Sequence, residues 1–552
     1  MSVQRRDFLR ALTALGLASL TRRGWPDDPA PAADPPAGAF CGTGLKGSPL
    51  FIPGDSGFLG RLQPRGGRFS LRAGSSSDGN STRALAYAAE RDGRPYANPT
   101  LVLQQGERLR IDLDNGLSES TIVHWHGLTV DTRNDGAGLT LVREGERFSY
   151  DFEVRDRGGL YWYHPHPHGA TGEQTYRGLF GLIEVEDADE RALRRALDLR
   201  PGRTEIPLVL QDRRSTSDYA ASAADQMHGF LGDTVLINGT ACPYLDVATR
   251  IYRFRVLNAS NARTYRLGFR TVAGKPLPFM LIGTDGGLLA AARPCAEAFI
   301  AAAERLDVLL DLSDASVGDT LYLDTLAFDP MHMDLPHEPP AAAGAVDHAA
   351  MGHAMPSGSA AAGDHATMDH GGGFPEGAAR ALLELRVRER VAPGARVPQR
   401  LSSQSSIDAS GAFERPLRLG FAKGHWRIND RVFVMGETPI EVKRGSVETW
   451  LIRNYFNSMP HAMHLHGFHF EVLERQTSPE QIAALKIDER GRLATDLGRK
   501  DTVLVWPGET VRIAIDFSLP AAAPFAGEQI YVFHCHNLEH EDGGMMLGVK
   551  VS

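Results

Sequence analysis

The chain has 552 residues, a formal net charge of −9 and 42% hydrophobic residues. This length predicts about three domains, each long enough to bury its own core, and the composition is that of an ordinary globular protein. The acidic balance, without a block of Lys and Arg beyond the N-terminus, argues against nucleic acid as a partner.

Residues 1–39 have the pattern of an export signal followed by a linker. Arg5 and Arg6 precede a mostly apolar run, residues 11–20, which is too short to span a bilayer. The pattern resembles a signal for the twin-arginine export machinery, and the Pro- and Ala-rich stretch after it predicts a disordered linker. We therefore expect a folded protein exported to the periplasm or outside the cell, with no membrane span in the mature protein.

Strand patterns dominate the rest of the chain. Apolar residues alternate with mostly polar ones at residues 109–113, 252–256 and 511–517, as they do in half-buried strands. Clusters of Gly and Pro separate such segments. The sequence therefore predicts an all-β protein built from Greek-key barrels or sandwiches.

A faint internal repeat divides these strands among three related domains. Strands that end at Asn115, Asn258 and Asn454 are each followed by a loop and another strand. A histidine cluster follows the first and the third of them but not the second, so we expect the middle domain to be a spacer without a metal site. The expected domains are residues 45–192, 200–330 and 379–552.

Four short segments hold eleven of the twenty histidines. They are residues 124–127, 162–169, 461–467 and 534–546. In a strand, side chains two residues apart point to the same face, so each His-x-His pair presents two imidazoles about two strand rises apart. One such pair is a weak signal, because histidines on exposed strands are common. Four pairs together predict a centre of adjacent metal ions.

The last of these segments predicts two linked metal centres. If residues 532–537 form a strand, His534 and His536 face one way and Cys535 faces the other. Cys535, His540 and Met545 then supply the thiolate, the imidazole and the weak axial thioether of a blue-copper site. The two flanking imidazoles remain available to a second centre one residue away.

With these motifs, nearly everything after about residue 50 resembles the multicopper oxidase family, and its bacterial copper-tolerance branch more closely than plant or fungal laccases. The resemblance implies three cupredoxin domains and four copper ions, one of type 1, one of type 2 and two of type 3. It also implies that substrate electrons enter at the type 1 copper and that the other three ions, the trinuclear cluster, reduce dioxygen to water.

Carried over by position, the resemblance implies twelve copper ligands. The type 1 ligands are His461, Cys535, His540 and Met545. The type 2 ligands are His124 and His464. The type 3 ligands are His126, His164, His166, His466, His534 and His536. His168 and His469 lie outside the pattern and are expected behind the ligands or at the surface, and Met546 is expected to face the opposite side from Met545.

Asp135 and Glu541 stand where the family places acids that supply protons. Reducing dioxygen to water consumes four protons as well as four electrons, so a buried cluster needs titratable groups within hydrogen-bond reach. The alternative is that both carboxylates only orient imidazoles as hydrogen-bond acceptors. We favour the proton relay.

Residues 331–378 form an insertion that differs from its surroundings. Its first 43 residues are rich in Ala, Gly and Pro but hold five methionines and six histidines. Thioethers prefer Cu(I), and the resemblance implies a Met-rich insertion over the type 1 site, so we interpret the segment as a Cu(I) recruitment patch. The alternative is a disordered linker. The residues of this patch are Met331, Met333, His348, Met351, Met355 and Met368.

We therefore expect a multicopper oxidase that oxidises Cu(I) one electron at a time, in copper tolerance, with dioxygen as the acceptor. The alternative is a laccase that oxidises small phenols or aromatic amines. A non-catalytic copper-binding scaffold is disfavoured, because all twelve ligand positions are retained. A disulfide between Cys242 and Cys295 stays open, since spacing alone cannot show that their Cβ atoms meet.

Overall fold

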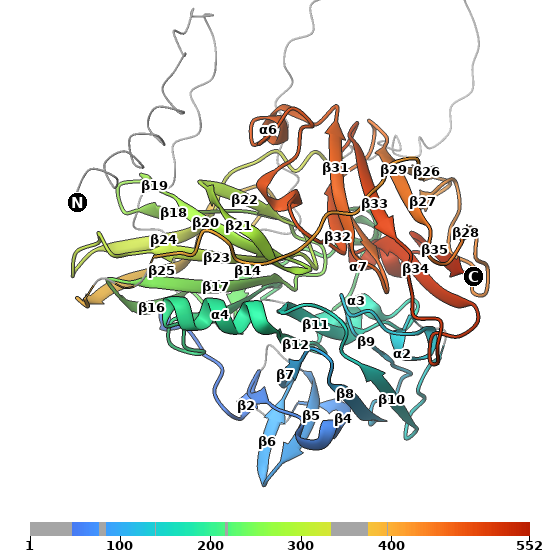
Figure 1. Cartoon of the computed structure of the whole chain (residues 1–552), viewed down its shortest axis with the longest axis horizontal. Coiled ribbons are helices and arrows are strands. Elements are labelled where there is room, and N and C mark those ends of the chain that lie inside the picture. The colour runs from blue at the N-terminus through green and yellow to red at the C-terminus, as the bar shows by residue number, and fades with distance from the viewer. Residues whose placement is uncertain are drawn as a thin grey trace, which may run out of the picture. The chain divides into compact units, whose positions relative to one another are not determined.

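The computed structural model describes residues 47–76, 84–137, 140–215, 219–332, 374–392, 394 and 396–552. Strands predominate in these ranges and form six sheets, two in each of three sandwiches (Figure 1). The expected all-β class is confirmed. The export signal and linker, residues 1–39, lie outside the described part of the chain. No helix in the described part is long and apolar enough to cross a membrane.

The first sandwich, blue to cyan in Figure 1, packs a six-stranded sheet on a five-stranded one. The strand order of the larger sheet is β10 (Arg147–Glu153), β8 (Arg108–Asn115), β4 (Arg68–Ser75), β5 (Leu85–Arg91), β6 (Arg94–Ala97) and β2 (Gly57–Phe58). The smaller sheet contains β3 (Arg61–Leu62), β7 (Thr100–Gln104), β12 (Gly181–Glu186), β11 (Gly159–Pro165) and β9 (Val123–His124). In β8, Leu109, Ile111 and Leu113 are buried between the sheets, which confirms the expected alternation.

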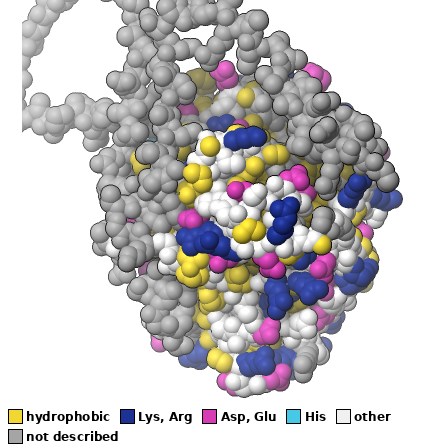
Figure 2. All heavy atoms as spheres, turned by 90° about the vertical axis from the view of Figure 1, so that its left-hand side faces the viewer, with side chains coloured by type: hydrophobic (Ala, Val, Ile, Leu, Met, Phe, Trp, Pro, Cys, Tyr) yellow, Lys and Arg dark blue, Asp and Glu magenta, His cyan; other side chains and the backbone are white. Residues whose placement is uncertain are grey.

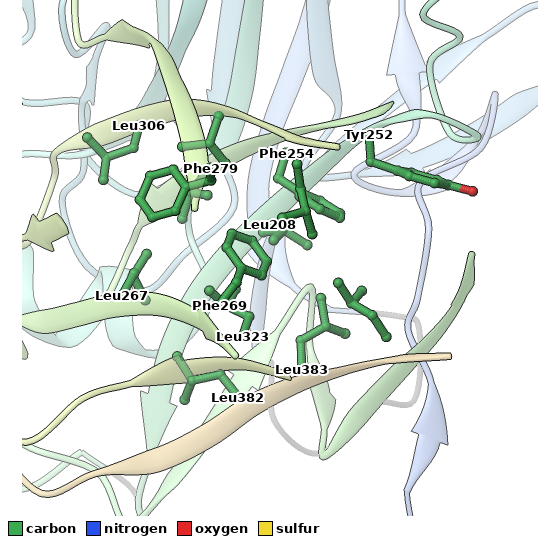
Figure 3. Close-up of a cluster of buried hydrophobic side chains, with 14 of the residues drawn as sticks. Leu208, Tyr252, Phe254, Leu267, Phe269, Phe279, Leu306, Leu323, Leu382 and Leu383 are labelled. Carbon is green, nitrogen blue, oxygen red and sulfur yellow. The ribbon is translucent and has the colours of Figure 1, made fainter. Parts of the chain in front are cut away.

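The middle sandwich, green in Figure 1, contains two seven-stranded sheets. One has the order β1 (Ser48–Pro49), β16 (Pro243–Ala248), β25 (Arg380–Glu389), β24 (Thr320–Thr325), β18 (Tyr265–Thr271) and β19 (Pro276–Leu277), with β22 (Glu297–Ile300) also on β18. The other has the order β15 (Thr240–Ala241), β14 (Thr234–Ile237), β13 (Glu205–Arg213), β17 (Ile251–Asn258), β23 (Arg305–Asp311), β20 (Phe279–Thr284) and β21 (Gly287–Cys295). The rings of Phe254 and Phe269, 6.0 Å apart, join the two sheets in the core (Figure 3).

Strand β25 belongs to this middle sandwich, whereas we expected residue 379 to begin the third domain. It pairs in parallel with β16 and antiparallel with β24. Leu382 and Leu383 point into the same core as Phe254 and Phe269 (Figure 3), so burial of these side chains decides the strand's place. The insertion therefore interrupts the middle domain instead of dividing it from the third.

The third sandwich, orange to red in Figure 1, contains two five-stranded sheets. One has the order β27 (His425–Ile428), β26 (Phe413–Ala422), β29 (Val447–Asn454), β33 (Thr510–Asp516) and β31 (Phe470–Gln476). The other has the order β28 (Ile440–Val442), β35 (Met546–Val551), β34 (Gln529–Cys535), β30 (His461–Leu465) and β32 (Thr502–Val505). Val511, Ile513 and Ile515 of β33 are buried in the core between them, as the alternation predicts.

Short helices lie in the loops between strands. They are α2 (Thr132–Asp135), α3 (Thr171–Tyr176), α4 (Ala188–Leu197), α5 (Ala223–His228), α6 (Glu480–Ala483) and α7 (Leu538–Asp542), with 3-10 turns η1 (Arg65–Gly67) and η2 (Ala494–Asp496). Helix α7 contacts both α3 of the first sandwich and α5 of the middle one. The histidine motifs therefore lie where the three sandwiches meet.

The possible disulfide between Cys242 and Cys295 is not formed, and Cys295 is a buried free thiol. On the face shown in Figure 2, basic and acidic side chains are interspersed with apolar ones.

Candidate metal centres

Two pairs of strands bring the four histidine motifs together. Strand β9 pairs with β11 so that His124 lies opposite His164, and β30 pairs with β34 so that His464 lies opposite His534. Strands β9, β11 and β34 lie near the boundary between the first and third sandwiches (Figure 1).

Alternation along β34 separates two sites. Cys535 lies in the core of the third sandwich, while His534 and His536 turn toward His166 and His164 of the first sandwich. Since successive side chains of a strand point to opposite faces, one tripeptide contributes to both sites. The expected alternation of side chains along residues 534–536 is confirmed.

Eight buried imidazoles form one group, here named the histidine cluster. Its members are His124, His126, His164, His166, His464, His466, His534 and His536. The ring nitrogens come close in two sets of three. In one set, His126 Nδ1 and His536 Nε2 each lie 3.4 Å from His164 Nε2. In the other set, His466 Nε2 and His166 Nε2 lie 3.0 and 3.5 Å from His534 Nε2.

His124 and His464 form the remaining pair. Their Nδ1 atoms donate to the backbone carbonyls of Asp135 at 2.7 Å and Asp501 at 2.8 Å. Their Nε2 atoms are buried without a hydrogen-bond partner among the described residues. A buried lone pair without a donor is costly, and a bound cation removes that cost. The donor set, imidazole alone, therefore fits copper ions.

Burial keeps these rings neutral. It is the main reason why the pKa values of His124 and His466 lie well below the usual value, and neighbouring imidazoles lower them further. Neutral imidazole is the form that binds a metal.

A second group, here named the cysteine site, lies on the opposite face of β34. Its members are His461, Cys535, His540 and Met545. Cys535 Sγ lies 3.6 Å from Nδ1 of both His461 and His540. Burial raises the pKa of the Cys535 thiol to about 12, so formation of the thiolate at neutral pH requires a cation at this place. Met546 packs instead with Ala137 and Val532, on the opposite side from Met545 as expected.

Helix α5 of the middle sandwich covers the cysteine site. His540 Nε2 and Trp426 Nε1 lie 3.0 and 2.9 Å from the carbonyl oxygen of Met227, and the Trp426 ring lies against His461. Ser458 Oγ lies 3.2 Å from His461 Nε2. His461 and His540 are consequently 0% and 1% exposed. This cover was not predicted from the sequence.

Known proteins with similar sequences and folds identify this arrangement. Two family models, both described as multicopper oxidase, match residues 92–190 and 406–552. The laccase of Bacillus subtilis (strain 168) is 30% identical over 473 residues, which cover 78% of this chain and 80% of that protein. The chain belongs to the multicopper oxidase family. It is an oxidoreductase that binds copper and uses dioxygen.

Two further relatives agree. The multicopper oxidase mco of Staphylococcus aureus is 26% identical over 480 residues, which cover 86% of this chain and 85% of that protein. The crystal structure of the McoA multicopper oxidase from the hyperthermophile Aquifex aeolicus is 36% identical, with a TM-score of 0.75, and covers 92% of this chain and 100% of that one.

Two aspartates orient the histidine cluster of this oxidase in matching ways. Asp135 accepts from His124 Nδ1 through its backbone carbonyl, and its carboxylate lies 2.8 Å from His466 Nδ1. The backbone carbonyl of Asp501 accepts from His464 Nδ1, and its carboxylate lies 3.1 Å from His126 Nε2. The sequence analysis found Asp135 and missed Asp501, whose only local signal is its place directly before β32, the strand that pairs with β30.

The pKa values of the two aspartates are shifted in opposite directions. Burial, and then Asp131, raise the pKa of Asp135 well above its usual value. Burial also acts to raise the pKa of Asp501, but Arg305 and His126 more than offset it, so this pKa lies well below the usual value. Asp135 is therefore the aspartate that can hold a proton, whereas Asp501 stays ionised.

Glu541 of α7 contacts histidines of both outer domains. Its carboxylate oxygens lie 3.4 Å from His166 Nε2 and 3.2 Å from His534 Nδ1. Burial acts to raise its pKa, but these two imidazoles hold the pKa well below the usual value. Glu541 therefore lies within proton-transfer reach of the cluster as a carboxylate.

Both described ends of the insertion lie beside α5. His332 stacks on His228 with ring centroids 5.2 Å apart, and its Nε2 lies 2.9 Å from the carboxylate of Glu376. Met331 packs near the cysteine site, in the cluster that contains Ala462. The other residues of the expected patch, Met333, His348, Met351, Met355 and Met368, lie outside the described residues.

His168, inside a motif, and His469, two residues after one, stand apart from the cluster, as expected. His168 is exposed and its ring packs against Phe433 at 5.2 Å. His469 is half-buried, and its Nε2 lies 3.9 Å from Asp501.

Proposed function

We propose that this multicopper oxidase oxidises Cu(I) to Cu(II) at the cysteine site and reduces dioxygen to water at the histidine cluster, with a role in copper tolerance. Four copper ions would serve it. In this assignment the type 1 ligands are His461, Cys535, His540 and Met545. The type 2 ligands are His124 and His464. The two type 3 ions take His126, His164 and His536, and His166, His466 and His534.

The assignment follows the nitrogen atoms that converge in each group. When bound, the copper ions supply one-electron transfer at the cysteine site and four-electron reduction of dioxygen at the cluster. Cys535 is covalently linked to His534 and His536 through one peptide unit on each side, so an electron that reaches its sulfur has a short bonded path to the cluster. Glu541, beside His166 and His534, and Asp135, beside His466, pass protons to the cluster.

The observation that carries the choice of Cu(I) is the cover over the cysteine site. A bulky phenol needs contact with an exposed edge of His461 or His540, and both imidazoles are buried beneath Met227, Trp426 and Ser458. Cu(I) needs only soft or imidazole ligands near the cover. His332 and Met331 stand there, at the start of a segment with four more methionines and five more histidines.

The second candidate is a laccase that acts on small phenols or aromatic amines. It is favoured by the similarity to the laccase of Bacillus subtilis. A copper-binding scaffold without catalysis is disfavoured, because the chain retains all twelve ligand positions and because buried donor groups such as His461, Cys535 and His540 lie close together.

Export through the twin-arginine machinery, to the periplasm or outside the cell, is the proposed route. Arg5, Arg6 and the apolar run after them support it. A folded protein with its copper sites already formed is suited to a route that carries folded chains.

Two variants separate the candidate substrates. In the first, residues 333–373 are replaced with a short Gly/Ser linker, which keeps the contacts of Met331 and His332. In the second, the segment keeps its length, and Met333, Met351, Met355 and Met368 become Leu, which removes the thioethers and keeps the bulk. Turnover on Cu(I) at limiting copper and on a bulky phenol is measured for both and for the wild type.

We expect the linker variant to lose Cu(I) oxidation and to gain phenol oxidation, with the blue absorbance unchanged. The leucine variant should lose Cu(I) oxidation without a gain on phenol, because the segment keeps its length and bulk. General destabilisation would lower both activities. Wild-type Cu(I) kinetics in both variants would assign the enzyme to the laccases.

A further inference from the structure

Asp501 orients one histidine from each outer domain. Its carboxylate Oδ1 lies 3.1 Å from His126 Nε2 and accepts from Thr502 Oγ1 at 2.9 Å. Its backbone carbonyl accepts from His464 Nδ1 at 2.8 Å. One residue thus contacts a proposed type 3 ligand and a proposed type 2 ligand.

Arg305 of the middle domain holds Asp501 from the other side. Its buried guanidinium donates to both carboxylate oxygens, through Nη1 at 2.9 Å and through Nη2. Its three other N–H groups donate to the carbonyls of Leu160, Ala303 and Asp285. All five N–H groups of the side chain therefore have acceptors, and the fork cannot turn without breaking several bonds.

This contact decides which nitrogen of His126 carries hydrogen. A carboxylate held by an arginine fork only accepts hydrogen bonds, so His126 Nε2 is the donor. The lone pair is then on Nδ1, which lies 3.4 Å from His164 Nε2 on the side of the cluster. A partner that fixes the second nitrogen of an imidazole also fixes its ring orientation toward the metal.

Asp135, which makes the matching contacts in the other half of the cluster, has no such support among the described residues. Its Oδ1 is buried without a hydrogen-bond partner there. Arg305 therefore adds to one half of the cluster a rigid contact that the other half lacks.

We propose that Arg305 is a positioning residue of the trinuclear site and that, through Asp501, it sets the orientation and tautomer of His126. The middle domain, expected to be a spacer, is then part of the copper site. This inference rests on the proposed function in one respect, namely that His126 binds copper.

The test compares Arg305→Gln and Arg305→Lys with a matched control, Arg253→Gln. Arg253 is also a fully buried arginine of the middle domain, and its partners are the carboxylates of Glu190, Glu205 and Asp307. None of these partners contacts a histidine of the cluster in the described structure. For each copper-loaded protein, the copper retained in a chelator titration, the type 2 signal in electron paramagnetic resonance, the blue absorbance and the melting temperature are measured.

We expect Arg305→Gln to weaken copper binding at the cluster by about 10- to 100-fold and to change the type 2 signal, with the blue absorbance intact. The copper affinity of Arg305→Lys should lie between those of Arg305→Gln and the wild type, because a lysine keeps the charge and loses the fork. Arg253→Gln should lower the melting temperature and leave copper affinity and the type 2 signal as in the wild type.

Equal losses of copper in Arg305→Gln and Arg253→Gln would overturn the inference, because they would assign the effect to stability alone. Wild-type copper affinity and an unchanged type 2 signal in Arg305→Gln would also overturn it. If that variant does not fold, the same two readings in Arg305→Lys decide the matter. A wild-type protein without copper in the cluster would refute the proposed function itself, which is a separate outcome.

Discussion

Replacing Glu541 with glutamine tests whether protons reach the cluster through this carboxylate. Its oxygens lie 3.4 Å from His166 and 3.2 Å from His534, and glutamine keeps the shape but cannot exchange a proton. Loss of a general acid or base typically costs about 10² to 10⁴ in rate, which is about 2.7 to 5.4 kcal/mol in the barrier. Loss of an orienting contact costs about 10- to 100-fold and is seen in copper affinity.

A proton-relay role therefore predicts a change in the reoxidation rate, whereas an orienting role predicts a change in copper affinity. Fully reduced enzyme is mixed with dioxygen in a stopped-flow instrument, and the return of the blue absorbance is followed. We expect reoxidation of Glu541→Gln to be at least about 100-fold slower than that of the wild type. Anaerobic reduction of the cysteine site and the copper content should not change.

Glu539→Gln is the matched control, because Glu539 is also a buried carboxylate of α7. It accepts from the backbone N of Phe230 at 2.9 Å and from Asn261 at 2.8 Å, and it contacts no histidine of the cluster in the described structure. Its reoxidation should stay near the wild-type rate. Wild-type reoxidation in Glu541→Gln would refute the relay, and weaker copper binding with a small change in rate would leave Glu541 an orienting role only.

The remaining predictions concern the copper ions. Cys535→Ser should remove the blue colour and lower the copper content from about four to about three per chain, because the histidine cluster keeps its ligands. Metal analysis and absorbance check this, and a variant that stays blue would contradict the assignment. Removal of all copper should lower the melting temperature, because an ion that binds only the folded state at 1,000 times its Kd stabilises it by about 4 kcal/mol. Calorimetry of the apo and copper-loaded proteins measures the difference, and equal melting temperatures would argue against bound copper at these sites.

Local geometry explains why so much of the site was predicted. The period of two along a strand places His534 and His536 on one face and Cys535 on the other, whatever the rest of the fold does. The alternation at 109–113 and 511–517 likewise predicted which strand faces are buried. Such patterns depend only on neighbours in the chain, so a sequence reveals them.

The same reasoning failed for strand β25. Its apolar residues fit the core of either neighbouring domain, and only the pairing with β16 and β24 decides between them. In the sequence, the insertion also separates β25 from the other strands of the middle domain. The change in composition therefore suggested a domain boundary where the structure has none.

The sequence by itself determined the strand class and the two sets of donor atoms. It also determined that His534, Cys535 and His536 contribute to both sets from one tripeptide. The tertiary structure decided what surrounds them: the cover of α5 over His540, and the fork of Arg305 on Asp501. Arg305 and Asp501 are 196 residues apart in the chain, and neither lies in a histidine motif. Contacts between such distant residues follow from how three sandwiches pack together, and no local period of the sequence records that packing.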